Sequence, residues 1–290
     1  MRIPDARLDE VRTQGFTVVE QFLDRETLAA AQEALWKVFP TPAQYFADPA
    51  RHKGYTRSQF AGMRLFPYPS WALNRLAVLP DLVDAAERLC ETTDLHLYKV
   101  ELWAKYAGAI DYSQTHHRDY GNHSLVVPKR ASPDVQMTTF ILLSDVTECD
   151  GPTKVVPLGN SRDVPLVPRE LPMGELFDRE IAITAPAGSL LIYRTDVLHR
   201  GSDFTAPNRA RFAMLVDFQR RGLPWTGKMA WPNQSLSKDW PEAMARMTPR
   251  ERELFGFPGT TDPYWDEQTI RDVGLRYPAM DMSSYLAARC

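Results

Sequence analysis

Several features that would place the chain in a special class of protein are missing from its 290 residues. No stretch approaches the roughly 18 uninterrupted apolar residues of a membrane-spanning helix, and the first residues hold no apolar run long enough for a signal peptide. The net charge is only −3, so no strong basic field is present to hold a nucleic-acid backbone or an anionic membrane. We therefore expect a cytoplasmic protein whose partners include neither nucleic acid nor a membrane.

Cysteine is also scarce. Cys90, Cys149 and Cys290 are odd in number and show no CxxC spacing, which argues against a disulfide framework or a structural zinc site and favours reduced thiols. Proline, in contrast, occurs 23 times, which is typical of many short elements joined by turns. Because 44% of the residues are hydrophobic, the chain can bury a sizeable core.

The part of the chain before about residue 95 is expected to contain a strand and two helices. Phe16–Val19 is a short apolar, β-branched run, which predicts a strand. Asp24 is a candidate N-cap, and apolar residues then recur at helical spacing until Pro40. A second amphipathic helix is predicted from about Leu82 to Cys90. The segment between the two helices, rich in Tyr, Phe, Arg and Pro, is left unassigned.

From about residue 95 the pattern changes to short strands separated by turns. HLYKVELWAKY alternates His96, Tyr98, Val100, Leu102 and Ala104 on one side, and β-branched or apolar runs follow in VQMTTFILL, KVVP, EIAIT, SLLIY and RFAMLVDFQ. Such strands without interleaved helices predict a sandwich or barrel rather than a doubly wound parallel sheet. We expect a single domain over residues 1–290, with helical and strand elements at about 1–94, a strand core at about 95–221 and an irregular, aromatic extension at about 222–290.

Two residues of metal-ligating type, His117 and Asp119, stand two positions apart in THHRDYG. In an extended strand such residues project from the same face, so both can reach one metal ion. His199, just past an apolar run that ends near Tyr193, is a candidate third ligand. Two His and one carboxylate on one face of an octahedron leave three positions open, the arrangement of non-haem Fe(II) oxygenases. The open positions suit a bidentate 2-oxo acid and dioxygen.

The other histidines fit a metal site less well. His116 has the wrong parity to share a face with Asp119 and is expected in the core or on the substrate side, while His52 and His96 are expected to be structural. Taken alone, a His-x-Asp triplet also fits a surface loop or a hydrogen-bonded pair. The triplet HRD suggests a kinase catalytic loop, but the Asn expected five residues after Asp119 is Ser124, and no Gly-rich loop or DFG triplet is present.

A 2-oxo dicarboxylate also requires a cation for its distal carboxylate. Arginine suits this role because its planar fork binds a carboxylate bidentately and stays charged when buried. Arg209 and Arg211 follow His199 by 10 and 12 residues and share strand parity. Arg211 leads directly into the apolar run FAMLV and is the preferred anchor, whereas Arg209 follows Pro207 and Asn208, where the chain is expected to turn. For either arginine, a surface ion pair is the alternative.

Several segments together resemble the phytanoyl-CoA dioxygenase (PhyH) family. GFTVVEQFLDRETLAAAQEAL resembles its N-terminal strand and helix, and THHRD resembles its metal triplet, usually His-Gln-Asp. MTTFILLSDVTECDGPTKVVPLGNSR resembles a strand leading to an acidic turn, then Asn-Gly and Val-Pro-Gly-Ser-His. LHRGSDFTAPNRARFAML resembles the distal His, followed by Asn and by Arg before an apolar strand. The motifs occur in the family's order and spacing through nearly the whole chain.

The resemblance implies a mainly β fold with flanking helices, namely a double-stranded β-helix, or jelly-roll, of the cupin kind. It implies Fe(II) bound by His117, Asp119 and His199, with 2-oxoglutarate as co-substrate and Arg211 as the anchor for its carboxylate. The implied partners are therefore 2-oxoglutarate, O2 and a small-molecule substrate, and the oligomeric state is left open.

Further positions match the family less closely. Gln114 matches a residue that in some members hydrogen-bonds the co-substrate, and Thr153 matches a threonine in a Gly-x-Thr turn that does the same. Arg118 replaces the usual Gln between the ligands, Asp150 replaces Asn before Gly151, and LGNSR replaces Pro-Gly-Ser-His. None of these departures removes a ligand, and they indicate a substrate unlike those of the best-known members.

The reaction implied is hydroxylation of an unactivated C–H bond, coupled to oxidative decarboxylation of 2-oxoglutarate with release of succinate and CO2. Halogenating relatives carry Gly or Ala where Asp119 stands here, so hydroxylation is favoured over halogenation. Desaturation, ring formation or epimerisation in the same fold, and a catalytically silent jelly-roll binding protein, are the alternatives. A CoA ester, a carrier-bound amino acid, a lipid and a small metabolite all stay open as substrates.

Overall fold

The computed structural model describes residues 2–119, 136–167, 171–222 and 230–288. β-Strands of 2–12 residues dominate the middle of the chain, as its runs of β-branched residues predict. The strands are β1 (Phe16–Val19), β2 (Met63–Leu65), β3 (Leu95–Tyr106), β4 (Gln136–Leu142), β5 (Lys154–Val156), β6 (Ile181–Ala182), β7 (Leu190–Tyr193), β8 (Leu198–Arg200) and β9 (Ala210–Arg220).

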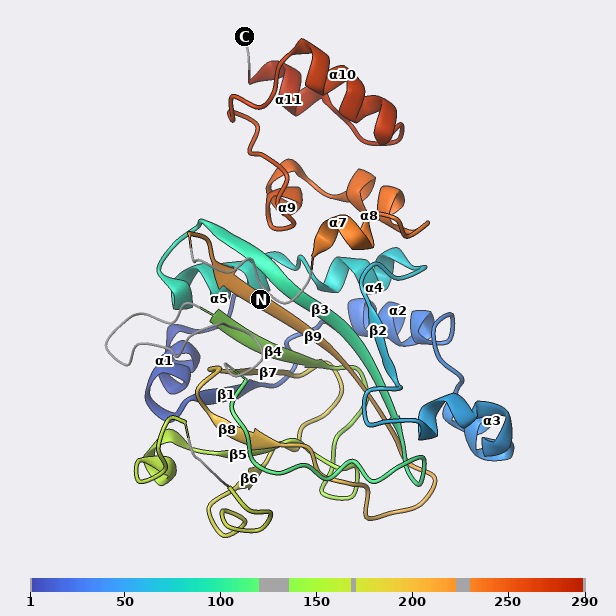
Figure 1. Ribbon diagram of the computed structural model, residues 1–290, viewed down its shortest axis with the longest axis vertical. Coiled ribbons are helices and arrows are strands. Elements are labelled where there is room, and N and C mark those ends of the chain that lie inside the picture. Colours follow the sequence, from blue (N-terminus) through green and yellow to red (C-terminus); the bar gives the residue numbers. More distant parts are fainter. Residues whose placement is uncertain (1, 120–135, 168–170, 223–229, 289–290) are drawn as a thin grey trace.

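These strands form two antiparallel sheets that face each other (Figure 1). The larger sheet has the order β1-β7-β4-β9-β3-β2, and the smaller has the order β6-β5-β8. The long strands β3 and β9 pair along nearly their whole length in the larger sheet. The arrangement is the mainly β jelly-roll with flanking helices that the sequence predicts.

Helices pack on the outer face of the larger sheet and beyond one end of it (Figure 1). No helix within the described ranges is long and apolar enough to cross a membrane. The helices are α1 (Asp5–Gln14), α2 (Arg25–Leu35), α3 (Pro42–Ala47), η1 (Pro49–Thr56), α4 (Trp71–Leu76), α5 (Pro80–Cys90), η2 (Leu158–Ser161), α7 (Trp231–Gln234), α8 (Trp240–Arg246), α9 (Pro249–Glu253), α10 (Glu267–Arg276) and α11 (Ser283–Ala287).

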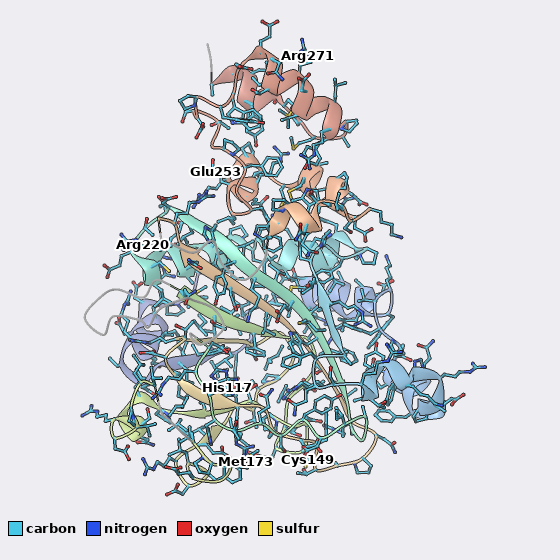
Figure 2. The ribbon with its side chains drawn as sticks, in the orientation of Figure 1. His117, Cys149, Met173, Arg220, Glu253 and Arg271 are labelled. Carbon is cyan, nitrogen blue, oxygen red and sulfur yellow. The ribbon has the colours of Figure 1, made fainter. Side chains whose placement is uncertain are left out.

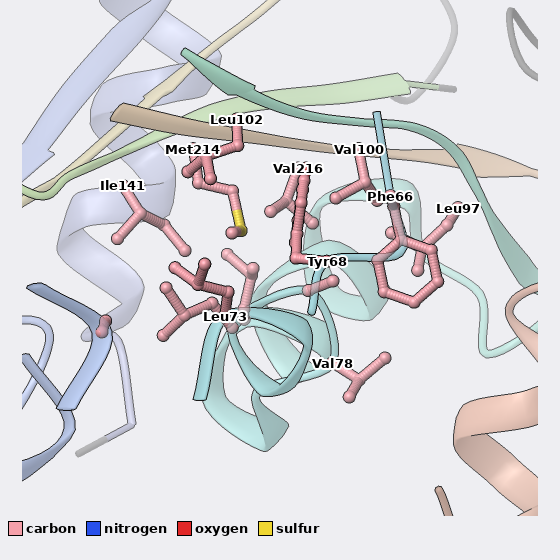
Figure 3. Close-up of a cluster of buried hydrophobic side chains, with 14 of the residues drawn as sticks. Phe66, Tyr68, Leu73, Val78, Leu97, Val100, Leu102, Ile141, Met214 and Val216 are labelled. Carbon is pink, nitrogen blue, oxygen red and sulfur yellow. The ribbon is translucent and has the colours of Figure 1, made fainter. Parts of the chain in front are cut away.

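The main hydrophobic core lies between the larger sheet and these helices (Figure 3). Val100 of β3 and Met214 and Val216 of β9 meet Leu73 of α4 there, and all four are fully buried. Burial of one such side chain contributes about 1.5–3 kcal/mol to stability. Because the helices cover this face, the opposite face of β3 and β9 is left to line the space between the sheets.

The structure corrects part of the alternation predicted for β3. The predicted stripe packs in the core from Val100 onward, but the register shifts between Leu97 and Lys99. Such a bulge adds one residue and reverses the side-chain parity before it, so Leu97 joins the main core cluster, whereas His96 and the fully buried Tyr98 lie outside that cluster. The extra residue could not be predicted from the alternation of apolar and polar residues in the sequence.

The C-terminal extension is helical in its described part, so the expectation of an irregular segment was wrong. Helices α7 to α11 are only 4–10 residues long, and all but α10 are too short for a hydrophobic period to show. Trp231, Trp240 and Phe255 surround Phe66 at ring-centroid distances of 5.0–6.0 Å. This aromatic cluster ties the extension to the core, while α10 and α11 project farthest from the sheets (Figure 1).

Candidate metal centre and cavity

The side chains of His117, Asp119 and His199 converge between the two sheets. One ligand atom from each lies within 4.8 Å of the other two. His199 Nε2 is 3.5 Å from Asp119 Oδ1, and the two imidazole centroids are 4.5 Å apart. Figure 2 marks His117 close to the smaller sheet. Two imidazoles and a carboxylate at this spacing form a donor set suited to one Fe(II) ion.

Backbone pairing places the two histidines side by side. His117 N donates to His199 O at 2.9 Å, and His199 N donates to His117 O at 3.0 Å. Residues that exchange both bonds in an antiparallel pair stand directly opposite each other. His199 belongs to β8 itself rather than to a loop after β7, and β8 is held by β5. Asp119 then follows His117 by two residues, on the same side.

Hydrogen bonds fix the orientation of each ligand. In both histidines Nδ1 lies 3.0–3.1 Å from the backbone carbonyl two residues earlier. A histidine that donates through Nδ1 presents Nε2 as its metal-binding atom. The Tyr193 hydroxyl donates to Asp119 Oδ2 at 2.7 Å, which leaves Oδ1 directed at His199. The site is therefore preorganised by the strands around it.

The protonation equilibria of His117 and His199, next to the Asp119 carboxylate, favour binding of a metal cation. Burial and the neighbouring His199 lower the pKa of His117, so this imidazole is neutral and free to bind metal. For His199, burial opposes protonation, but the Asp119 carboxylate outweighs it and raises the pKa. A divalent ion bound here would take the place of that proton, as metal binding to histidine normally does.

The three side chains open onto a cavity whose wall is the inner face of β3 and β9. Lys99, Glu101, Trp103 and Lys105 line it from alternate positions of β3. Sequence reasoning missed these four residues. The signal was present in HLYKVELWAKY, where they alternate with the apolar stripe, but only the apolar side was used. Tyr193, the partner of Asp119, was also missed as a site residue.

The two candidate arginines, Arg209 and Arg211, differ in burial and in hydrogen-bond partners. Arg211 is 9% exposed, lines the cavity and donates to the Gly151 carbonyl oxygen. Burial lowers the pKa of Arg211 to about 10, so the guanidinium stays charged at neutral pH. Arg209 instead forms a two-point ion pair with Asp150, with distances of 2.6 and 2.8 Å and a side chain that is 44% exposed. Asp150, one of the departures from the family pattern, is thus the partner of Arg209.

Gln114 and Thr153 both line the cavity. The Gln114 amide is engaged at both ends. Its Nε2 donates to Gln59 Oε1 at 3.0 Å, and its Oε1 accepts from Gly201 N at 2.9 Å. Gln114 therefore links the loop before β2 to the strand segment that follows His199.

His116 and Arg118, on either side of His117, point away from the metal cluster. His116 is buried with Nε2 3.0 Å from Glu180 Oε2, in agreement with the parity argument. Arg118 donates to three backbone carbonyl oxygens, including that of Asp196 at 2.8 Å. Arginine in place of the usual Gln thus braces the outside of the site without touching the ligands.

Comparisons with solved structures place this fold among known enzymes. The non-heme alpha ketoglutarate dependent carbocyclase SnoK from nogalamycin biosynthesis is 17% identical, with a TM-score of 0.52 over 75% of this chain and 84% of its own. HygX from Streptomyces hygroscopicus, solved with nickel and 2-oxoglutarate bound, is 13% identical, with a TM-score of 0.53 over 76% of this chain and 88% of its own. At such identities the likeness supports the fold alone. No curated protein matches the sequence.

The family comparison covers the site as well as the fold. The model described as phytanoyl-CoA dioxygenase (PhyH) matches residues 11–212. That range includes the three converging ligands and Arg211, together with every strand up to the start of β9. The chain therefore belongs to the phytanoyl-CoA dioxygenase (PhyH) family and is an oxygenase that depends on Fe(II) and 2-oxoglutarate.

Proposed function

We propose that the protein is a hydroxylase that acts on a C–H bond of a small organic substrate, with release of succinate and CO2. The complete set of His117, Asp119 and His199 around one point in the cavity carries the proposal. When iron and 2-oxoglutarate are bound, they supply the activation of dioxygen. The chain itself supplies the geometry, the charge and a shaped cavity.

In this proposal Nε2 of His117, Oδ1 of Asp119 and Nε2 of His199 hold the iron. The observations behind this choice of atoms are the engagement of each Nδ1 with a carbonyl and of Asp119 Oδ2 with Tyr193. Asp119 contributes the negative charge of the set. Three protein ligands leave room for a two-point 2-oxo acid and for dioxygen.

Arg211 is the proposed anchor for the distal carboxylate of 2-oxoglutarate. It is a buried cation in the wall of the same cavity as the ligands, and its side chain is held by Gly151. Gln114 and Thr153 are proposed to contact the co-substrate from the neighbouring wall. Since both ends of the Gln114 amide are already engaged, its contribution is expected to be mainly to the shape of that wall.

The rest of the cavity indicates a substrate with an apolar or aromatic body and a polar group. Phe60, Trp103, Phe140 and Leu215 provide apolar surface, and Glu101 provides a carboxylate held by the Trp103 indole at 3.1 Å. Phe60 is 57% exposed and meets Trp103 edge to face at 5.7 Å. This aromatic pair is suited to guiding a flat or apolar group into the cavity.

The test is a metabolite screen with isotopically labelled dioxygen. Purified protein with Fe(II), 2-oxoglutarate and ¹⁸O2 is incubated with fractionated small-molecule extracts, and Asp119→Ala is run in parallel. Hydroxylation predicts a product that gains one labelled oxygen atom, matched by succinate and absent with the variant. A product that loses two hydrogens without gaining oxygen would assign desaturation or ring formation instead. Failure to form succinate under any condition would support a silent binding protein.

A further inference from the structure

Lys105 stands beside Arg211 in the cavity wall. Strands β3 and β9 pair in a register that sets Lys105 directly opposite Arg211, and both side chains line the cavity. Directly opposed residues of an antiparallel pair have Cβ atoms about 4.5–5.5 Å apart, and like charges there destabilise the sheet. The register thus brings together two basic side chains that repel each other when both are charged.

Neither side chain has a carboxylate partner among the residues that the structure describes. Both are only 9% exposed. The Lys105 ammonium lies over the Tyr112 ring at 4.7 Å and near the Trp103 ring at 5.9 Å, while Arg211 contacts the Gly151 carbonyl. Buried charges are normally paired. Within the described ranges, the pair therefore forms a basic pocket without a carboxylate.

Acidic groups act on this pocket only from a distance. Asp203, in the segment after β8, attracts Lys105, and Asp150 attracts Arg211. Asp150 is already bound at two points by Arg209. No described carboxylate is therefore placed to pair with these two cations, and the co-substrate brings a carboxylate to this wall of the cavity.

Among Lys105, Arg211 and Tyr112, the residue whose charge can change near neutral pH is Lys105. Burial and the adjacent Arg211 hold the pKa of Lys105 well below its usual range. Burial raises the pKa of Tyr112 to about 12, and the pKa of Arg211 is about 10, so both groups keep their protons over most of the range from pH 6.5 to about pH 9. A carboxylate placed between the two basic groups favours the protonated amine.

We propose that Lys105 and Arg211 together bind the distal carboxylate of 2-oxoglutarate, and that Lys105 takes up one proton from solvent as the co-substrate binds. The proposal rests on the co-substrate assignment made above. Arg211 supplies the planar two-point contact and Lys105 a compact point charge. In the empty cavity a neutral Lys105 relieves the repulsion. In the filled cavity two positive charges face one carboxylate, so Lys105 makes the site selective for 2-oxo acids that carry a second carboxylate.

Proton uptake is tested on the unmodified protein. Calorimetric titration of the anaerobic Fe(II) protein at pH 7.5, in two buffers of different ionisation enthalpy, counts the protons bound with each ligand. 2-Oxoglutarate is expected to take up a proton, up to one per site, whereas 2-oxobutyrate, which lacks the distal carboxylate, takes up none. Equal uptake with both acids, or none with either, would overturn the proposal. This comparison needs no variant and so does not depend on whether a substitution folds.

A second experiment assigns the proton to Lys105. For the wild type, the dissociation constant of 2-oxoglutarate should rise with pH between 6.5 and 9, by up to roughly tenfold per pH unit, because linkage ties affinity to the proton taken up. Lys105→Met should bind 2-oxoglutarate at least about tenfold more weakly at pH 6.5, lose the pH dependence and bind 2-oxobutyrate normally. Unchanged affinity and pH dependence in Lys105→Met would refute the role of Lys105. If the wild type binds no 2-oxoglutarate at all, the co-substrate assignment fails first.

Discussion

Arg209 and Arg211 have the same strand parity, and burial is the property that distinguishes them. A desolvated arginine–carboxylate pair loses about 2–5 kcal/mol when one side is removed, whereas an exposed pair contributes about 0–1 kcal/mol. Arg211→Ala should therefore raise the dissociation constant of 2-oxoglutarate by roughly 30-fold or more, and Arg209→Ala should change it only a few-fold. Anaerobic equilibrium dialysis of both variants checks this. A larger loss of 2-oxoglutarate affinity in Arg209→Ala than in Arg211→Ala would instead assign the anchor to Arg209.

His96 gives a second expectation at the scale of one residue. Burial and the positive charge of Arg221 lower the pKa of His96 to about 4, whereas an unfolded histidine titrates near 6.5. Between these values the unfolded chain binds a proton that the folded protein does not, so the free energy of unfolding falls as pH drops from about 6.5 to about 4. Above that range the contribution of His96 is fully retained.

Urea unfolding of wild type and His96→Asn at pH 7 and pH 5 measures this effect. Other groups titrate equally in both proteins, so the comparison isolates position 96. The loss of stability between the two pH values should be smaller in His96→Asn than in the wild type. An identical loss in the two proteins would mean that His96 is not held neutral by the fold.

At the scale of elements, one carboxylate ties together the two segments that carry the histidine ligands. Glu180 binds Arg200 of β8 at two points, each 2.7 Å long, and lies 3.0 Å from His116. Glu180→Gln leaves the Arg200 charge buried without its ion pair, and breaking a buried pair costs about 3–5 kcal/mol. Chemical denaturation should show such a loss, together with weaker iron retention.

The matched control for Glu180 is Asp163. Asp163 pairs with Arg179 at 2.8 Å, next to Glu180 in the chain, but the Asp163 side chain is 64% exposed. Asp163→Asn should therefore leave both the free energy of unfolding and iron retention nearly unchanged. Equal losses from the two variants would show that burial of the Glu180 pair has no special role.

Elements specified by short-range signals were predictable from the sequence. β1 covers the predicted Phe16–Val19, and α2 begins after Asp24, whose side chain accepts from Thr27 N. The three metal ligands were also within reach, because two of them lie two residues apart and a family motif carries the third. Arg211 was favoured over Arg209 because it continues into the apolar run that becomes β9.

Features that depend on strand register were not predictable. The bulge between Leu97 and Lys99 leaves no mark in the alternation of the sequence. Lys105 and Arg211 are far apart in the chain, and they become neighbours through the register of β3 against β9. Among the short C-terminal helices, α9 and α10 begin at capping boxes, formed by Thr248 with Glu251 and by Asp266 with Thr269.

At the scale of the whole molecule, the aromatic cluster on Phe66 couples the C-terminal extension to the jelly-roll. We therefore expect residues 1–290 to unfold as a single domain, with one transition in calorimetry. Trp240, 3% exposed, lies 6.0 Å from Phe66 and 5.8 Å from Phe255. Trp240→Ala should cost about 3–5 kcal/mol and lower the Tm of the entire transition. Two separate transitions, with only one shifted by the variant, would show that the extension is an independent domain.

The central claim is that His117, Asp119 and His199 hold iron to which 2-oxoglutarate then binds. The most direct measurement is the visible metal-to-ligand charge-transfer band that forms when 2-oxoglutarate is added to the anaerobic Fe(II) protein. The account predicts this band in the wild type and in His116→Gln, whose side chain faces Glu180, and no band in a variant with both His117→Ala and His199→Ala. A wild type without the band, or a band that survives in the double variant, would contradict it.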